Sequence, residues 1–305
     1  MGRRPAARRT ATVLMGIGLL ATALPGCGDS EPRADGVTVA VTQRPWAAIT
    51  RAIAGDRATV VDAGAAPGAD PHLFEPDART AATISNADIV VLNGADLDHW
   101  AEEIVTGTDR DQRVVTAAEE LGIEEGVGDT DPHLWFAPDG VPAVARAIAD
   151  DLTAADPDGR ATYERGLARF LAEWEPVAER VTAVRRDVAG TPVAVTERVA
   201  DRLLRSLGLR IESPSGFAIA VEEGEEPDAR DTAAMNALVT SGRIGALVYN
   251  VDAETSATAQ VRSLANDASV PVVEVTEAMP ATATSYPAWV GGLVGEIERA
   301  LRPSP

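Results

Sequence analysis

Two copies of one tripeptide are the residues of this chain with the clearest potential for chemistry. The chain holds three histidines in 305 residues, and two of them stand in Asp-Pro-His, at residues 70–72 and 131–133. Proline fixes its own φ and restricts the residue before it, so each imidazole is presented from a stiffened backbone. Neutral imidazole is a common ligand for zinc, manganese and iron. The repetition favours a metal site containing His72 and His133 over two capped loops with incidental histidines.

An aromatic residue, a second proline and a helical pattern follow each tripeptide. We expect Asp77 and Asp139 to cap these two helices. The third histidine, His99, stands in Asp98-His99-Trp100 at the expected start of another helix. We predict a structural or surface role for His99, outside the metal site.

The elements that must position these histidines alternate between strand and helix. The β-rich runs are Val37–Val41, Thr59–Val61, Ile89–Leu92, Val193–Val195, Ala246–Tyr249 and Val272–Val275. Helical patterns lie between them, as at Ala78–Ala87, Val141–Leu152 and Asp231–Ser241. Apolar strands separated by helices predict parallel sheets built from βαβ units, and therefore an α/β fold.

One long helical pattern, from about residue 156 to 188, interrupts this alternation. Its apolar residues recur at helical spacing and fall on one face: Leu167, Phe170, Leu171, Trp174, Val177, Val181, Val184 and Val188. Gly190 and Pro192 then end the helix. We predict two lobes, each a mainly parallel sheet with flanking helices, joined by this connecting helix. The N-terminal lobe would cover residues 37–155, the helix 156–189 and the C-terminal lobe 190–305.

The N-terminal segment has the features of an export signal. Its first ten residues carry four arginines and no acid, and a short apolar stretch follows at residues 11–24. The single cysteine comes next, in Leu24-Pro25-Gly26-Cys27, where small residues before a cysteine are typical of lipid attachment. We predict a signal peptide over 1–26, lipidation of Cys27 and a tether over 27–36. Ordinary cleavage with an incidental thiol is the alternative. Lipidation would hold the exported protein at the outer face of the cytoplasmic membrane.

Composition excludes several other classes of protein. There are 47 acidic and 27 basic residues, giving a formal net charge of −20. Such a surface repels phosphates, which argues against nucleic-acid binding as the main role. One cysteine allows neither an intramolecular disulfide nor a thiolate metal cluster. The sequence also lacks His-Glu-x-x-His, Gly-x-Ser-x-Gly and a phosphate-binding glycine loop, so we do not expect an enzyme.

Several motifs together resemble one family, the solute-binding lipoproteins of the manganese, zinc and iron ABC importers. These motifs are both Asp-Pro-His segments, residues 93–100, the long helix, residues 191–197 and Glu225-Glu226-Pro227 before a helix. The resemblance covers nearly the whole chain after the signal peptide.

The resemblance implies four metal ligands, two from each lobe, that meet in the cleft between the lobes. Two of them correspond to His72 and His133. The third opens the helix after the first strand of the C-terminal lobe and corresponds to Glu197. The fourth, usually an aspartate just past a late strand, corresponds to Glu277, with Glu274 as the alternative. Glu197 and Glu277 also stand at expected strand ends, where open α/β sheets place ligand sites.

Two carboxylates with two neutral imidazoles offset the charge of a divalent ion in a buried cleft. Oxygen-rich ligation favours Mn²⁺ or Fe²⁺, whereas equilibrium affinity rises toward Zn²⁺. Mn²⁺ is therefore the first choice and Zn²⁺ the second. The acidic run at residues 222–226 is interpreted as a solvated loop outside the site, before a helix capped near Asp228.

The resemblance implies a binding protein that captures a divalent metal outside the membrane and delivers it to an ABC permease and its ATPase. We expect a monomer. One alternative is a surface lipoprotein or adhesin of the same fold that binds a metal chelate. The other is a metal-dependent hydrolase, which would need an open coordination position that four protein ligands scarcely leave.

Overall fold

The structure is a computed structural model, and it describes residues 1–2, 36–66, 69–123 and 131–302. The chain divides into two units, Met1–Asp35 and Gly36–Pro305, and the fold described below is that of the second unit. The predicted signal peptide, the tether and the lipidated Cys27 lie outside the described residues, apart from residues 1, 2 and 36. Among the helices of the described part, none is both long and apolar enough to cross a membrane.

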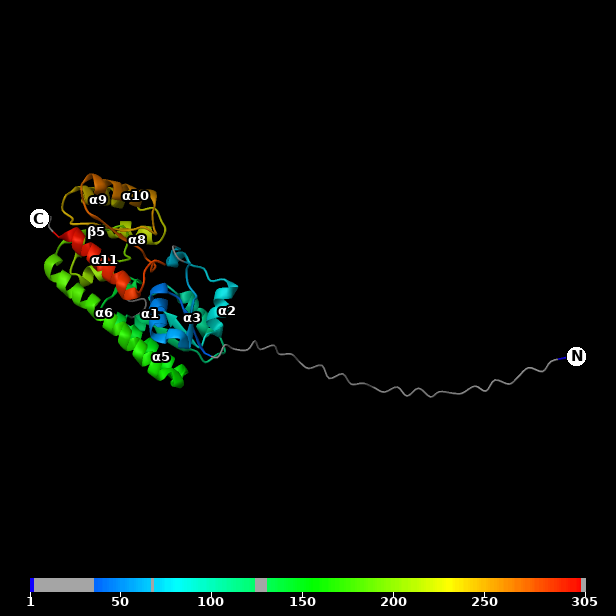
Figure 1. Cartoon of the computed structure of the whole chain (residues 1–305). Coiled ribbons are helices and arrows are strands. Elements are labelled where there is room, and N and C mark those ends of the chain that lie inside the picture. The colour runs from blue at the N-terminus through cyan, green and yellow to red at the C-terminus, as the bar shows by residue number, and fades with distance from the viewer. Residues whose placement is uncertain (3–35, 67–68, 124–130, 303–305) are drawn as a thin grey trace. The chain divides into compact units, whose positions relative to one another are not determined.

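The first sheet lies in the part of the chain drawn from blue to cyan in Figure 1. It has four parallel strands in the order β2-β1-β3-β4. The strands are β1 (Val37–Val41), β2 (Ala58–Asp62), β3 (Ile89–Leu92) and β4 (Arg113–Thr116). Its helices are α1 (Arg44–Ala54), α2 (Ala78–Asn86), α3 (His99–Thr106), α4 (Ala117–Glu120) and α5 (Val141–Ala155), with a 3₁₀ turn η1 at Gly55–Arg57. All four residues of β3 are buried, as expected for a central strand covered on both faces.

The second sheet repeats this arrangement, with four parallel strands in the order β6-β5-β7-β8. The strands are β5 (Pro192–Val195), β6 (Arg210–Ile211), β7 (Leu247–Asn250) and β8 (Val272–Val275). The helices are α7 (Asp201–Ser206), α8 (Ser215–Glu222), α9 (Ala229–Thr240), α10 (Ser256–Asp267) and α11 (Tyr286–Leu301). In both sheets the strand order reverses beside the first strand, because the second strand lies on one side of it and the third on the other. Open α/β sheets bind ligands at this switch point.

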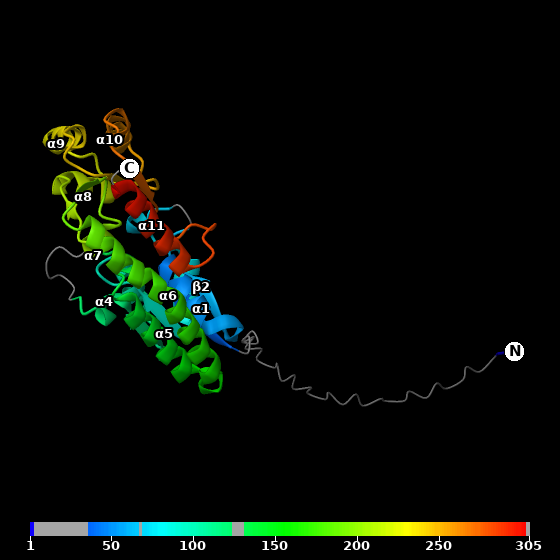
Figure 2. The same ribbon diagram turned by 60° about the vertical axis from the view of Figure 1, so that its left-hand side comes forward.

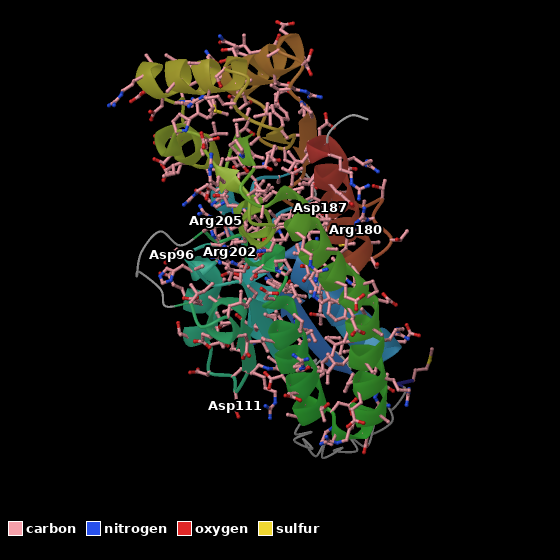
Figure 3. The ribbon with its side chains drawn as sticks, turned by 90° about the vertical axis from the view of Figure 1, so that its left-hand side faces the viewer. Asp96, Asp111, Arg180, Asp187, Arg202 and Arg205 are labelled. Carbon is pink, nitrogen blue, oxygen red and sulfur yellow. The ribbon has the colours of Figure 1, made fainter. Side chains whose placement is uncertain are left out.

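A single helix, α6 (Arg160–Val188), joins the two lobes and follows a 3₁₀ turn, η4 (Pro157–Gly159). It packs against α1 and α5 of the first lobe and against α11 (Figure 2). Arg180 of α6, which Figure 3 labels, also forms an ion pair with Glu298 of α11, at 2.8 Å. Gly190 follows with φ +81°, a conformation that glycine adopts at low cost. The predicted fold class, two α/β lobes joined by one long helix, is confirmed.

Some local predictions were confirmed and others were wrong. Asp77 caps α2, accepting a hydrogen bond from the backbone N–H of Thr80, and Asp228 caps α9. Asp139 does not cap α5, because the helix begins at Val141, as the pattern indicated, and Gly140 stands at the N-cap position. Strands β4 and β6 were not predicted. Both are short of apolar residues, because β4 contains two of them and β6 has only two residues in all.

Candidate metal centre

The two Asp-Pro-His tripeptides form the same local turn. The Asp70 carboxylate accepts a hydrogen bond from the backbone N–H of His72 at 2.8 Å, and Asp131 does the same for His133 at 3.0 Å. Short 3₁₀ turns follow, η2 (Pro71–Leu73) and η3 (Leu134–Phe136). Aspartate and proline thus fix the backbone that carries each imidazole.

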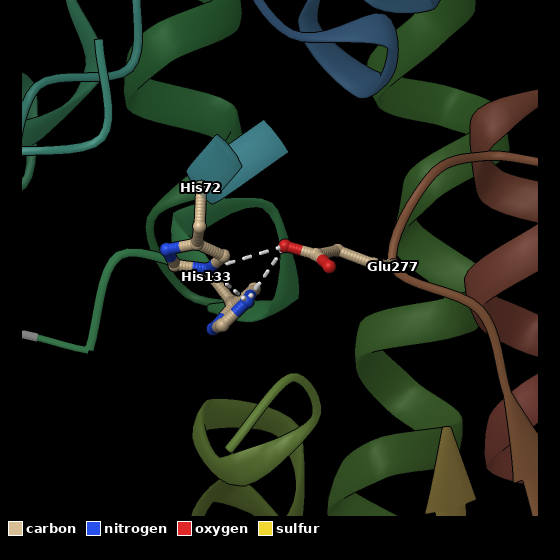
Figure 4. Close-up of side chains that lie close together, drawn as sticks. All are labelled: His72, His133 and Glu277. Carbon is tan, nitrogen blue, oxygen red and sulfur yellow. Dashed lines mark hydrogen bonds and ion pairs between the residues drawn. The ribbon is translucent and has the colours of Figure 1, made fainter. Parts of the chain in front are cut away.

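Three side chains, His72, His133 and Glu277, converge in the structure (Figure 4). The Nε2 atoms of the two histidines are 3.4 Å apart. Glu277 Oε1 lies 3.0 Å from His133 Nε2 and 3.3 Å from His72 Nε2. Two ligands of one ion with bonds of about 2.1 Å are separated by about 3.4 Å in a tetrahedron and about 3.0 Å at a right angle. The three separations therefore suit a single metal ion.

Both lobes contribute to this group of three. The histidines follow β2 and α4 of the first lobe, whereas Glu277 comes from the loop after β8 of the second. His133 and Glu277 are buried, and the side chain of His72 keeps 20% of its surface exposed. His72 is therefore the member of the group that solvent reaches.

A shell of hydrogen bonds orients His133. Asp131 Oδ1 lies 2.8 Å from His133 Nδ1, so the proton on Nδ1 points away from the centre and Nε2 faces it. The carbonyl of Pro132, next to His133, accepts a hydrogen bond from the Asn93 side chain at 2.9 Å. From the other lobe, Arg202 donates to the carbonyl of Asp131 at 3.0 Å. The shell was not predicted, although Asn93 lies in a motif that carried the resemblance.

The electrostatics of the group without metal are those of a buried ion pair. Burial would lower the pKa of His133, but hydrogen bonds to Asp131 and Glu277 outweigh it and raise that pKa to about 10. Burial would likewise raise the pKa of Glu277, but His133 and His72 lower it to about 2. An imidazolium therefore faces a carboxylate, and a metal ion must replace the proton on Nε2.

Glu197 is buried close to this group but is not one of its three members. It lies in the turn between β5 and α7, where its carboxylate accepts a hydrogen bond from Asn250 at the end of β7. Burial and the charge of Glu277 raise the pKa of Glu197 to about 8. The expectation that Glu197 opens a helix was wrong, because α7 begins at Asp201.

Glu274 and His99 both lie on the surface. The Glu274 side chain, 53% exposed, projects from β8 between buried Val273 and Val275 and pairs with Arg262. His99 is exposed at the start of α3, with its Nδ1 3.2 Å from Glu102. These positions favour Glu277 over Glu274 as the carboxylate after the late strand.

The interpretation of the acidic run as a solvated loop was wrong for its first residue. Glu222 ends helix α8 and is 4% exposed. Its Oε1 lies 3.9 Å from His72 Nε2. Both of its oxygens also accept hydrogen bonds from Arg198, at 2.6 and 2.9 Å. Helical spacing was the available signal, because Glu222 falls four residues after the buried Ala218.

The fold consists of two parallel α/β lobes joined by one long helix, and the site brings together two imidazoles and a carboxylate from both lobes. Together they define a metal-binding solute-binding protein. Residues 39–300 match the family described as ZnuA, zinc-uptake complex component A, periplasmic, and the chain belongs to this family. The family consists of solute-binding proteins rather than enzymes, in agreement with the sequence prediction.

The names of related proteins include three different metals: zinc, manganese and iron. The chain is 26% identical over 270 residues to the zinc-binding lipoprotein AdcA of Streptococcus pneumoniae, covering 83% of this chain and 52% of that protein. It is 29% identical over 174 residues to the manganese-binding lipoprotein MntA of Halalkalibacterium halodurans, covering 55% and 56%. It is 30% identical over 167 residues to the iron ABC transporter substrate-binding lipoprotein MtsA of Streptococcus pyogenes, covering 51% and 54%. The matches thus span about half the length of these curated relatives.

Solved structures show the same fold. FpvC of Pseudomonas aeruginosa, in complex with Mn²⁺, superposes with a TM-score of 0.72 at 20% identity, covering 87% of this chain and 98% of that one. The periplasmic zinc-binding protein TroA of Treponema pallidum gives 0.73 at 18% identity, covering 88% and 100%. At these identities the likeness establishes the architecture alone.

Proposed function

We propose that this protein captures a divalent transition-metal ion outside the cytoplasmic membrane and delivers it to an ABC permease. The observation that carries the proposal is the group of three nitrogen and oxygen atoms, 3.0 to 3.4 Å apart, supplied by both lobes. Membership of a family of solute-binding proteins supports transport over catalysis.

The proposed ligands are His72, His133, Glu277 and Glu197. The first three already have the separations that one ion requires. Support for Glu197 comes from its burial and from its electrostatic interaction with Glu277 and His133. A divalent charge beside Glu197 favours its ionised form, and the second carboxylate then completes the neutralisation of the ion.

Mn²⁺ is the first choice as cargo and Zn²⁺ the second, with Fe²⁺ also compatible. The argument rests on the donor atoms, because the relatives' names include all three metals. Two imidazoles and two carboxylates form an oxygen-rich set, which suits the harder ions better than a set with three imidazoles.

The proposed partners are a permease and its ATPase, and we propose that the protein acts as a monomer. The relatives named above are lipoproteins, which supports attachment to the outer face of the cytoplasmic membrane through Cys27. The strongly acidic composition is compatible with attraction of cations to the surface.

Metal analysis of the compact unit, residues 36–305, tests the proposal. The protein would be purified without chelator, offered equal concentrations of Mn²⁺, Fe²⁺ and Zn²⁺, and analysed for each element. We expect one metal ion per chain, lost in His72→Ala and kept in the control His99→Ala, which removes an exposed histidine. Absence of bound metal in the unaltered protein, or full retention by His72→Ala, would overturn the proposal.

A further inference from the structure

A third buried carboxylate, that of Glu222, lies beside the proposed ligands. Its helix, α8, follows β6 of the C-terminal lobe, and His72 follows β2 of the N-terminal lobe. The strands β2 and β6 occupy equivalent positions in the two sheets, so the two residues lie in equivalent connections. Glu222 Oε1 lies 3.9 Å from His72 Nε2. Glu222 is thus placed across the lobe boundary on the side of the solvent-accessible histidine.

The distance from Glu222 to His72 is compatible with shared coordination. Two ligands on opposite sides of an ion, with bonds of about 2.1 Å, are at most about 4.2 Å apart. The observed 3.9 Å falls below this limit and above the separation of about 3.4 Å in a tetrahedron. Glu222 is not one of the three residues whose ligand atoms all lie within 4.8 Å of one another, so its carboxylate must move further toward the ion to join the shell. It then fits an ion with five or six ligands and does not fit a tetrahedral ion held by the other four.

Arg198 holds this carboxylate in place and offsets its charge. Its Nε donates to Glu222 Oε2 at 2.6 Å, and one terminal nitrogen donates to Oε1 at 2.9 Å. Oε1 is the atom nearer His72, so it can turn to an ion while Oε2 stays bonded to Arg198. The guanidinium of Arg198 offsets the negative charge that Glu222 would otherwise add to that of the other two carboxylates.

We propose that Glu222 is an additional oxygen ligand that determines metal preference. It joins the coordination shell of ions that take five or six ligands, such as Mn²⁺, and stays on Arg198 when tetrahedral Zn²⁺ is bound. The inference rests on the proposed function, since it requires an ion on His72.

The test compares Glu222→Gln with Glu223→Gln in residues 36–305. The second variant removes the same charge one residue further on, at an exposed position. For Glu222→Gln we expect the Kd for Mn²⁺ to rise about tenfold or more, and the Kd for Zn²⁺ to change by less than about threefold. X-ray absorption of the Mn²⁺-loaded Glu222→Leu variant, which has no side-chain oxygen, should count one oxygen ligand fewer than in the unaltered protein. Glu223→Gln should resemble the unaltered protein in both measurements.

A double variant guards against misfolding, because Glu222→Gln removes a buried carboxylate to which Arg198 donates two hydrogen bonds. Arg198→Gln/Glu222→Gln removes both charges, and thermal unfolding of the metal-free forms checks that each variant is folded. The same selective loss of Mn²⁺ affinity in the double variant supports the inference. Equal losses for Mn²⁺ and Zn²⁺, or an unchanged ligand count, overturn it. Failure of the unaltered protein to bind either metal overturns the proposed function itself.

Discussion

His133 is the most constrained side chain of the metal centre. A carboxylate oxygen contacts each of its ring nitrogens, Asp131 at Nδ1 and Glu277 at Nε2. The contact at Nδ1 orients the ring for coordination, whereas the contact at Nε2 stabilises a proton at the position that the ion must occupy. Metal binding at this residue is therefore an exchange of a proton for a cation.

Metal affinity should increase with pH. Hydrogen bonds to Asp131 and Glu277 outweigh burial and raise the pKa of His133 to about 10. Burial and the charge of Glu277 raise the pKa of Glu197 to about 8. Near pH 7 both groups are protonated in the metal-free protein, and binding releases a proton from each. Titration calorimetry in buffers of different ionisation enthalpy would count the released protons. An affinity that does not change between pH 6 and pH 9 would contradict this prediction.

The identity of the carboxylate ligand after β8 can be tested with a matched pair of variants. Glu277→Ala should weaken metal binding by more than about a hundredfold, because it removes a ligand rather than a group that orients one. Glu274→Ala should leave the affinity unchanged, since this side chain is exposed and paired with Arg262. Competition with a chromogenic chelator measures both affinities. The opposite result would assign the ligand to Glu274.

At the scale of elements, helix α6 must approach α1 very closely. A Cβ added to Gly166 of α6 would lie 2.2 Å from the carbonyl oxygen of Ile53 in α1. A glycine in the middle of a helix weakens it, so its presence here is explained by the close packing of the two backbones. This contact fixes the long helix to the first lobe.

Gly166→Ala should lower the free energy of unfolding by about 1–3 kcal/mol, because the two backbones must separate. Gly292→Ala in α11 is the control, since a Cβ there meets nothing within 4 Å. The control should be neutral or stabilising by up to about 1 kcal/mol, as expected when alanine replaces glycine in an exposed helix. Urea denaturation measures both. Equal stabilities of the two variants would show that the helices can move apart freely.

At the scale of the whole second unit, the largest cluster of buried apolar residues extends across both lobes. A single cluster of buried residues contains side chains of both sheets and of α6. The Tyr286 hydroxyl of α11 donates to the carbonyl of Trp135, two residues after His133, and the ring of Tyr286 stacks on Trp174 of α6 at 5.2 Å. A large rotation of one lobe against the other would break these contacts beside the metal centre.

We therefore predict that metal release requires only a small movement of the lobes. Small-angle scattering of the metal-free and metal-loaded forms of residues 36–305 should give closely similar radii of gyration. The His72→Ala variant, offered the same metal, serves as the unloaded control. A radius that falls clearly on loading would indicate a wide hinge motion and would contradict the role of α6 as a rigid connector.

The fold class, the long helix and the pairing of the two histidines could be predicted from the sequence, because each depends on local features. Apolar residues at helical spacing specify α6 whatever surrounds it, and Asp-Pro restricts the backbone before each histidine within three residues. Alternation along β8 also indicates that Glu274 points outward, between two buried valines.

Features that depend on how the two lobes pack could not be predicted from the sequence. Glu222 was assigned to a solvated loop, although the lobe packing buries it beside His72 and Arg198. Strand β6 has two residues and is too short to give a pattern of its own, yet pairing with β5 defines it. These features depend on how the two sheets face each other across α6, because contacts between residues distant in sequence leave no local periodicity to detect.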